Sequence, residues 1–521
     1  MPGVNIFKYG KYLIMSNKVI KSVLISVFHK DGLADIVIKL NDLGVRMFST
    51  GGTYDFIKKM KIPVESVESL TTYPSILGGR VKTLHPTVFG GILSRRENPE
   101  DTGQLIKYKI PEIDLVIVDL YPFEETVACV SDDEKIIEKI DIGGISLIRA
   151  GAKNYKDVLI VSNREQYPAL LNILEEGEGE TTLKDRKQFA AEAFKTTSNY
   201  DTAIFNYFNI EAKIPAFRES INKSSVLRYG ENPHQKGIYF GDLDQYFEKL
   251  HGKEISYNNL LDIDAAISLI DEFSEITVAI IKHNNACGIA SRNNLQSAWK
   301  DALACDPVSA YGGIIVTNVT IDELTAHDID KIFFEIIIAP GYTEKASEIL
   351  RQKKNRIILL RKGNLKTTSQ HRSLLNGVLW QEKDISRESV QDMKVVTERT
   401  PLTEEFNDLV FANIIVKHSK SNAIVLVRNQ QLCASGIGQT SRVDALRQAI
   451  EKAKAFGFDL QGSVMASDAF FPFADCVEIA HKAGISAVVQ PGGSVRDKDS
   501  IDYCSRNGIA MVITGIRHFK H

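Results

Sequence analysis

The chain has 521 residues, 44% hydrophobic and 25% charged, a composition typical of globular proteins and a length that suggests about three domain-sized units. Its 63 basic and 66 acidic residues leave a formal net charge of −3, so charge gives no reason to expect nucleic acid or a membrane surface as a partner. No apolar run approaches the roughly 20 residues that span a bilayer.

The N-terminal stretch and the cysteines indicate the cellular context. Residues 1–16 contain no apolar segment of signal-peptide length with a small-residue cleavage site, so we expect an N-terminal extension there, with Met1 or Met15 as the start. The six cysteines are scattered and form no Cys-x-x-Cys pair. This predicts reduced thiols in a cytoplasmic protein and argues against both a disulfide framework and a clustered zinc site.

The first region alternates strand-like and helix-like segments. Apolar, β-branched runs predict buried strands at residues 23–27, 114–120 and 157–162. A segment of helical period spans residues 31–44, with Asp31 as a candidate N-cap and Gly44 as a candidate stop. Such alternation predicts a parallel sheet with helices on its faces.

A long helix is predicted next, over about residues 184–209, and residues 210–225 lose periodicity and predict a linker. Beyond Val226, two stretches of similar layout follow, divided by a charged segment near residues 362–400. Predicted strands lie at 276–283, 312–318, 356–360, 422–427, 486–490 and 508–513, and helices near 443–456 and 475–484. The similar layout predicts two α/β units of similar size.

Three loops of the first region combine glycines with polar side chains, at residues 48–56, 77–86 and 141–155. Glycines let the backbone approach a ligand closely, and helix N-termini attract phosphate. Because parallel sheets bind ligands outside the carboxyl ends of their strands, we expect the three loops to form one pocket for an anion. The alternatives are a plain strand–helix turn, a solvated basic loop, and an Asp141 that only caps a helix.

The stretch IKHNNACG, residues 281–288, is open to four interpretations: a metal site, a cysteine nucleophile, a proton-transfer site, or the polar end of a buried strand. A zinc deaminase needs a Pro-Cys-x-x-Cys partner, which the sequence lacks. Cys287 lies four residues from His283, but small buried cysteines are common. His283 beside Lys282 is the better candidate, because histidine moves protons near neutral pH; a structural histidine stays open.

Further polar loops in the second region offer candidate ligand contacts, at residues 227–235, 306–318, 467–484 and 490–500. The FFPF cluster in the third of them is more typical of core packing than of a ligand platform. Asp475, at the head of a predicted helix, is explained as well by capping as by binding.

Eight motifs taken together resemble a known family. STGGT, LGGRVKTLHP, DIGGISLIRAGAKN, LRYGENPHQ, IKHNNACG, DPVSAYGG, SDAFFPFAD and RHFKH occur in this order between about Val19 and His521. They resemble the bifunctional purine-biosynthesis enzymes that join AICAR transformylase to IMP cyclohydrolase. The resemblance implies a cyclohydrolase domain of methylglyoxal-synthase-like α/β fold over residues 17–213. It also implies a transformylase domain over residues 214–521, built from two cytidine-deaminase-like subdomains that lack the deaminase zinc.

The resemblance also implies the last two steps of IMP synthesis. The 5-amino group of AICAR takes a formyl group from the co-substrate 10-formyltetrahydrofolate to give FAICAR, which then closes to IMP with loss of water. AICAR, FAICAR, IMP and folate are thus the implied partners, and a homodimer with shared transformylase sites is implied as well. No catalytic metal is expected, and a structural monovalent cation is left open.

Site residues follow from the resemblance, position by position. Formyl transfer is assigned to Lys282 and His283, and ring closure to Lys82, Tyr121, Asp141 and Lys153. The positions expected to bind the cyclohydrolase substrate are Lys30, Thr50, Gly51, Gly52, Thr53, Arg80 and Thr83. Those expected to bind the transformylase substrates are Arg228, Tyr229, Asn422, Gln439, Phe470, Asp475, Ser494 and Arg517.

Three positions depart from the family's usual pattern. The usual SVSDKTG reads SVFHKDG here, so Phe28 stands where a serine hydroxyl often meets the ligand. Asp119 stands where asparagine is common, and Cys476 where asparagine or glycine is. These departures keep three alternatives in view: a transformylase with a weakened cyclohydrolase, a nucleotide-sensing module without turnover, and a methylglyoxal-synthase-like lyase based on the first domain.

Overall fold

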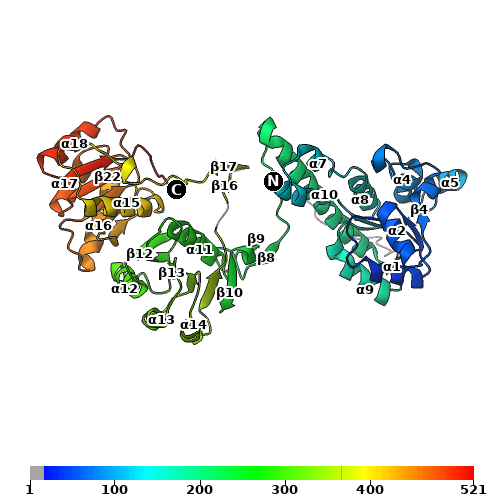
Figure 1. The fold of residues 1–521 in the computed structure, drawn as a ribbon, viewed down its shortest axis with the longest axis horizontal. Coiled ribbons are helices and arrows are strands. Elements are labelled where there is room, and N and C mark those ends of the chain that lie inside the picture. Colours follow the sequence, from blue (N-terminus) through cyan, green and yellow to red (C-terminus); the bar gives the residue numbers. More distant parts are fainter. Residues whose placement is uncertain (1–16, 365–366) are drawn as a thin grey trace, which may run out of the picture. The chain divides into compact units, whose positions relative to one another are not determined.

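The computed structural model describes residues 17–364 and 367–521, and the chain divides into two compact units, one ending at Ile221 and one beginning at Asn222 (Figure 1). The expected extension at residues 1–16 lies outside the described residues. No helix in the described ranges combines the length and the apolar character needed to cross a membrane.

The first unit is built on a five-stranded parallel sheet in the order β4-β3-β2-β5-β6. Its strands are β2 (Ser22–Val27), β3 (Arg46–Ser49), β4 (Glu65–Ser66), β5 (Leu115–Asp119) and β6 (Leu159–Val161), and a separate pair joins β1 (Lys18–Val19) to β7 (Glu180–Thr181). Its helices are α1 (Leu33–Asp42), α2 (Gly51–Lys59), α3 (Val67–Thr71), α4 (Pro86–Leu93), α5 (Pro99–Tyr108), α6 (Phe123–Cys129), α7 (Asp133–Ile137), α8 (Gly143–Lys153), α9 (Tyr167–Glu176) and α10 (Leu183–Ala212), with 3-10 turns η1 (Leu77–Gly79) and η2 (Arg164–Gln166). Alternate strand residues pack against α1 and α9 on one face and against α4, α8 and α10 on the other, which confirms the predicted α/β layering.

For helix α1, the predicted end is confirmed and the predicted N-cap is wrong. Gly44, with φ of 69°, donates its N–H to Asn41 and ends the helix as predicted. The prediction that Asp31 caps the start is wrong, because the N-cap is Gly32 in the left-handed region and no side chain caps it. The Asp31 carboxylate instead lies 3.6 Å from Arg164 on the surface.

The predicted long helix is α10, which runs 30 residues and ends three residues later than expected, at Ala212. Thr182 and Asp185 form a capping box at its start, so two of its free N–H groups are satisfied locally. Residues 213–223 form neither helix nor strand, and β8 (Ser224–Val226) then pairs with β9 (Ile238–Phe240). The predicted linker is therefore shorter than residues 210–225.

The second unit contains one twelve-stranded sheet in the order β10-β15-β14-β13-β11-β12-β20-β19-β21-β22-β23-β18. Its strands are β10 (Phe247–His251), β11 (Thr277–Lys282), β12 (Asn285–Ser291), β13 (Ile314–Thr317), β14 (Ile336–Ala339), β15 (Ile357–Arg361), β18 (Lys394–Val395), β19 (Ile424–Arg428), β20 (Gln431–Gly436), β21 (Val464–Ser467), β22 (Ala487–Gln490) and β23 (Ala510–Ile513). Its helices are α11 (Tyr257–Ile270), α12 (Leu295–Cys305), α13 (Glu323–Asp330), α14 (Glu344–Arg351), α15 (Thr403–Lys417), α16 (Arg442–Ala455), α17 (Asp475–Lys482) and α18 (Asp497–Arg506), with 3-10 turns η3 (Leu243–Gln245) and η4 (Val390–Asp392).

The strand order divides this sheet into two halves of the same design. Each half has an antiparallel hairpin, β11–β12 or β19–β20, followed by three parallel strands, β13–β15 or β21–β23. The halves meet where Ala290 of β12 pairs with Gln431 of β20. Helices α11 and α15 share one core on one face, while α12–α14 and α16–α18 form separate cores on the other. The predicted pair of α/β units is confirmed.

The charged segment at residues 362–400 holds a further hairpin, made by β16 (Ser369–Leu374) and β17 (Gly377–Glu382) (Figure 1). It forms a two-stranded sheet of its own, apart from the twelve strands. After it the chain returns as β18, which pairs with β23 at one end of the large sheet.

Candidate functional site

The loop of residues 50–53 in the first unit is fixed to the carboxyl end of β2. The Thr50 and Ser26 hydroxyls lie 3.0 Å apart. The Thr53 hydroxyl donates to the Val27 carbonyl at 2.9 Å and accepts the Val27 N–H at 3.2 Å. Gly51 and Gly52 open helix α2 beside these contacts, so free N–H groups of a helix start face the same edge as the end of β2.

Lys82 and Thr83 connect the second loop to the other two. A Cβ on Gly51 would lie 3.3 Å from the Lys82 ammonium, and a Cβ on Gly79 only 2.7 Å from Lys82 Cε. A Cβ on Gly143 would lie 3.1 Å from the Thr83 hydroxyl. The glycines therefore leave the space that these two side chains occupy. The structure thus brings the first loop to Lys82 and the third loop to Thr83, so the three predicted loops lie together.

Asp141 lies at the start of α8 but one residue before the N-cap position, which Ile142 occupies. Its carboxylate accepts the Gly144 N–H at 2.6 Å. Burial raises the pKa of Asp141, and backbone N–H groups of Gly144 and Tyr121 partly offset that effect. Burial also raises the pKa of Tyr121, with the nearby Asp141 charge adding to it. Both groups thus hold their protons more tightly than in water.

Tyr200 is a supporting residue that the sequence did not indicate. Its hydroxyl accepts the Asp141 N–H at 2.9 Å and donates to the Lys139 carbonyl at 2.8 Å. Burial raises the pKa of Tyr200 to about 12, so it stays a neutral hydrogen-bonding group. Because Tyr200 comes from α10, the long helix fixes the loop that carries Asp141.

Three further predicted residues of the first unit lie in different surroundings: Lys30, Arg80 and Lys153. Lys30 donates to the carbonyls of Val27 and Phe28, the latter at 2.9 Å, and burial lowers its pKa. Arg80 is exposed and pairs with Glu138. Lys153 ends α8, ten residues beyond Gly143, which corresponds to about 15 Å along the helix axis. Lys153 therefore lies at the opposite end of α8 from Gly143 and Gly144.

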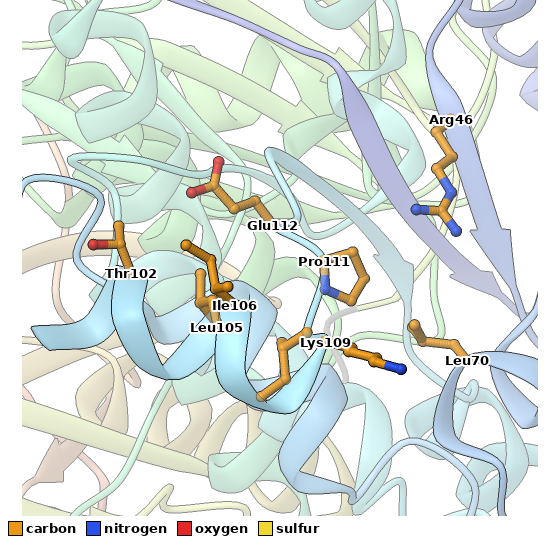
Figure 2. A pocket seen from close by; sticks show the side chains of 9 residues that line it. Arg46, Leu70, Thr102, Leu105, Ile106, Lys109, Pro111 and Glu112 are labelled. Atoms are coloured by element: carbon orange, nitrogen blue, oxygen red, sulfur yellow. The ribbon is translucent and has the colours of Figure 1, made fainter. Parts of the chain in front are cut away.

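A hollow in the surface of the first unit lies elsewhere (Figure 2). It has a volume of about 500 Å³ and is lined by residues such as Arg46, Leu105, Ile106 and Glu112. Arg46 begins β3 and Glu112 precedes β5, so this hollow lies at the amino ends of the strands, opposite the three loops. None of the predicted site residues lines it.

Strand direction brings most candidates of the second unit to one edge of the large sheet, which we name the Lys282 edge because β11 ends there. Strands β11, β20, β21, β22 and β23 run the same way, and β19 runs against them. Five strands therefore end, and β19 begins, at the Lys282 edge. The candidates found at this edge are Lys282, His283, Asn422, Gln439, Phe470, Asp475, Ser494 and Arg517.

The hairpin at residues 282–285, which we name the catalytic hairpin for the role that the resemblance implies, joins β11 to β12 by a two-residue turn. His283 and Asn284 have φ of 50° and 65°, the left-handed pair that suits the twist of a hairpin. The Asn284 N–H donates to the Asp262 carboxylate at 2.6 Å, and the Asn285 amide donates to the His283 carbonyl at 2.8 Å. Burial raises the pKa of Asp262. The hydrogen bonds to Asp262 and from Asn285 thus fix the turn, while His283 itself is exposed.

Lys282 is held by the loop that precedes β13. Its ammonium donates to the Tyr311 carbonyl at 2.7 Å, and a Cβ on Gly312 would lie 3.2 Å from it. Asp306, at the start of this loop, accepts the Ser309 N–H at 2.8 Å and lies 2.7 Å from Lys452 of the second half. The ion pair between Asp306 and Lys452 joins the two halves behind Lys282.

Cys287 is not placed as a nucleophile. It is buried, and burial raises the pKa of its thiol to about 12. A thiol nucleophile needs exposure and a lowered pKa. Of the alternatives for this stretch, proton transfer by His283 fits the exposed turn best.

Asn422 lies at the start of β19, next to the catalytic hairpin. The Lys420 N–H donates to Asn285 at 3.0 Å, which brings residues 420–422 beside the turn. The Asn422 amide donates to the Gln439 carbonyl at 2.9 Å and its oxygen accepts from Arg442 at 3.0 Å. Arg442, which the sequence did not indicate, also lies 2.7 Å from the buried Asp468 and so fixes Asn422 from behind.

The other candidates of the second unit lie on loops. The Phe470 ring is partly exposed while Phe471 is buried, so the FFPF cluster serves both core and surface. Asp475 is the first residue of α17, and its carboxylate accepts the Cys476 N–H at 2.8 Å.

Two arginines of the second unit lie over aromatic rings. Arg517 lies 4.4 Å from the centre of Phe519, and Arg228 lies 4.6 Å from the centre of Tyr229. Arg228 also donates to the Tyr229 hydroxyl at 2.6 Å. Arg228 and Tyr229 follow β8, outside the twelve-stranded sheet, so strand direction alone does not assign them to the Lys282 edge.

Comparison with known families agrees with this arrangement. Residues 32–146 match the model of the MGS-like domain, and residues 151–452 match that of the AICARFT/IMPCHase bienzyme. The chain belongs to the AICARFT/IMPCHase bienzyme family. It is 62% identical to the bifunctional purine biosynthesis protein PurH of Bacteroides thetaiotaomicron, over 97% of this chain and 99% of that protein. It is also 43% identical to PurH of Persephonella marina and 45% identical to PurH of Acetivibrio thermocellus, over 96% of this chain and the full length of each.

Proposed function

We propose that this bienzyme carries out the last two steps of IMP synthesis at two separate sites. The second unit transfers a formyl group from 10-formyltetrahydrofolate to AICAR, and the first unit closes FAICAR to IMP. The observation that carries the proposal is the catalytic hairpin, which presents Lys282 and His283 at the same sheet edge as Asn422 and Arg517. A core histidine would be buried, whereas His283 is exposed on a turn held by Asp262.

Formyl transfer needs a base, because the carboxamide of AICAR withdraws electrons from its 5-amino group. The amine nitrogen attacks the formyl carbon, and His283 takes the proton that the amine loses. The Lys282 ammonium stabilises the oxyanion of the tetrahedral intermediate. When the intermediate collapses, the C–N10 bond breaks, N10 receives a proton, and FAICAR and tetrahydrofolate leave.

Ring closure needs orientation more than a strong catalyst, because both reacting groups belong to one molecule. The carboxamide nitrogen attacks the formamide carbon, and the formamide oxygen leaves as water. The Lys82 ammonium, which the glycines of two loops surround, stabilises that oxygen as charge develops. Tyr121 and Asp141, whose pKa values are both raised, exchange the protons. The loop of residues 50–53 and Arg80 hold phosphate and ribose.

A two-stage assay tests both assignments. Purified protein receives AICAR and 10-formyltetrahydrofolate, and tetrahydrofolate and IMP are followed separately. We expect the parent protein to make both, Lys82→Ala to accumulate FAICAR, and His283→Ala to make neither from AICAR but still IMP from added FAICAR. Tetrahydrofolate without IMP beyond spontaneous closure would indicate a transformylase with a weakened cyclohydrolase. Neither product, with AICAR still bound, would indicate a sensing module.

Lys153 gives a sharper test of the first unit. Its resemblance-based role is catalytic, but it ends α8 about 15 Å from the helix start. We expect Lys153→Ala to slow closure of FAICAR at least tenfold less than Lys82→Ala does. Equal losses for the two variants would instead support the catalytic role that the resemblance implies for Lys153.

We also propose that the protein is a homodimer in the cytoplasm, with the hairpin of β16 and β17 in the dimer contact. An isolated two-stranded hairpin is marginally stable, yet this one exposes large apolar side chains, namely Leu375, Val378, Leu379 and Trp380. A second copy of the chain would cover them. The six cysteines are all free thiols, in keeping with a reducing compartment.

The dimer proposal is tested by light scattering on a Leu379→Ser/Trp380→Ser variant. We expect a monomer that keeps ring closure and loses formyl transfer, because the family builds the transformylase site from both subunits. Ile106→Ser, which removes an even more exposed apolar residue from the first unit, is the control and should leave the mass unchanged. A variant that remains dimeric would exclude this hairpin as the contact.

A further inference from the structure

His29 and Asp119 form a close pair at the carboxyl ends of two neighbouring strands of the first unit. Strand β5 ends at Asp119, which pairs with Val27, the last residue of β2. The Asp119 carboxylate accepts the His29 N–H at 2.9 Å and contacts the His29 ring nitrogen Nδ1 at 2.7 Å. Both side chains are mostly buried, with 26% and 14% of their surface exposed. One carboxylate oxygen therefore ties the turn after β2 to β5.

This turn carries groups that the ring-closing site needs. The Phe28 ring meets the Tyr121 ring edge-on, with centres 5.4 Å apart. The Lys139 ammonium lies 5.3 Å from the centre of Phe28 and 5.8 Å from that of Tyr121. Lys30 donates to the carbonyls of the same turn. A shift of the turn would therefore move Tyr121 and Lys30 together.

The pair holds a single carboxylate at the ends of β2 and β5. The Asp119 carboxylate faces both the backbone N–H and the ring nitrogen Nδ1 of His29. A second carboxylate at position 29 would place two negative charges within hydrogen-bond distance.

We propose that His29 and Asp119 are a positioning pair for ring closure, and that the pair tolerates only one carboxylate. The pair holds Phe28 against Tyr121 and keeps Lys30 directed at the turn. This inference rests on the proposed function of the first unit and names two residues that act through others rather than on the substrate.

A double-mutant cycle tests the pair on the full chain. We expect His29→Asp to lower kcat/KM for FAICAR closure at least tenfold, since Asp119 then faces a second carboxylate. Adding Asp119→Asn, which returns the pair to one carboxylate, should bring kcat/KM to within threefold of the parent. Asn41→Asp makes the same charge change at an exposed position of α1 and should leave closure unchanged.

Binding of IMP, measured by calorimetry on the same proteins, separates positioning from loss of folded protein. A positioning role predicts that His29→Asp weakens the Kd at unchanged stoichiometry and that Asp119→Asn recovers it, whereas a partly unfolded variant would lose stoichiometry. If the parent binds IMP without closing FAICAR, the proposed function fails and the Kd cycle still decides on the pair. If the double variant recovers neither the Kd nor the kcat/KM that His29→Asp loses, the proposal of a positioning pair is overturned.

Discussion

The second unit contains two hairpins of the same construction, and only one of them carries the residues proposed for formyl transfer. The catalytic hairpin is matched by a twin at residues 428–431, which joins β19 to β20. Its turn residues, Asn429 and Gln430, have φ of 52° and 51°, like the left-handed turn residues of the catalytic hairpin. The comparison therefore separates what the fold requires of such a hairpin from what the reaction requires.

The support beneath both hairpins is the same. Asp262 on α11 accepts the N–H at the tip of the catalytic hairpin, and Asp408 on α15 accepts those of Asn429 and Gln430 at 2.7 and 2.6 Å. Burial raises the pKa of both carboxyls. A buried carboxylate under the turn is thus a structural device of the fold.

The surroundings of the hairpins differ. Because β11 and β19 run in opposite directions, the twin lies at the other edge of the sheet. There Arg292 donates to the Asn429 carbonyl at 2.7 Å, so the twin is fastened to the first half. At the Lys282 edge, the Tyr311 carbonyl and residues 420–422 face the turn instead. The difference teaches that the hairpin is a scaffold, and that the histidine and its neighbours make the site.

Removing the histidine should give the largest contrast. We expect His283→Ala to lower kcat for formyl transfer by about 10²- to 10⁴-fold, as loss of a general base does. Asn429→Ala in the twin should change kcat less than threefold. Tetrahydrofolate release is the measurement, and equal losses in both variants would mean that the hairpins act only through stability.

The carboxylates under the turns sharpen the contrast. Asp262→Ala and Asp408→Ala should each cost about 1–3 kcal/mol of unfolding free energy, because each removes hydrogen bonds from turn N–H groups to a charged acceptor. Only Asp262→Ala should also lower kcat for formyl transfer, by about tenfold. Chemical denaturation and tetrahydrofolate release are measured side by side. A matching drop in kcat for Asp408→Ala would contradict the expectation that the twin has only a structural role.

His518, in the C-terminal segment, should make the free energy of unfolding depend on pH. Burial disfavours a charge on His518, but Asp384 and Glu388, with Nε2 of the ring 2.9 Å from Glu388, raise its pKa from 6.5 to about 9. The stabilisation is therefore complete below pH 6.5 and is lost as pH rises through 9, by roughly 3 kcal/mol in all. Denaturation of the parent between pH 6 and 10 should show this loss, and His518→Gln should remove the slope. A parent whose stability is flat over this range would contradict the charged pairing.

Placing a lysine and a histidine on the twin should have the smallest effect on formyl transfer. An Arg428→Lys/Asn429→His variant gives the twin the same two side chains as the catalytic hairpin. We expect no formyl transfer from it in a His283→Ala background, because the neighbours at that edge are absent. Recovery of tetrahydrofolate release would show instead that the hairpin alone is sufficient.

Much of the fold could be predicted from local patterns. The helical period of α10 and α16 and the apolar run of β11 predicted elements that the structure confirms. Strand β12 was not predicted, because its sequence, NACGIAS, lacks an apolar run and its extended form comes from pairing with β11. Strand β14, IIIA, is only four residues long and gives no period to detect.

The site could be predicted in part, for a similar reason. Loops that follow strands show their glycines and charges locally, so Lys82, Asp141 and His283 were found. Tyr200 and Arg442 were not, because each acts on a residue far along the chain, and only folding brings them there. For Asp31 the local pattern predicted too much. Aspartate is a good capping residue, but Gly32 occupies the N-cap, because glycine adopts the left-handed conformation there at no steric cost.

The left-handed turn of the catalytic hairpin has a consequence for the evolution and engineering of this protein. Asparagine and glycine occupy such positions with little strain, whereas a histidine there costs about 1 kcal/mol. The twin, free of catalytic duty, has Asn429 at the matching position. A redesign guided by thermostability alone would therefore replace His283 with asparagine or glycine, raise the melting temperature and remove the proposed base. At this one residue, selection for folding and selection for turnover favour different side chains.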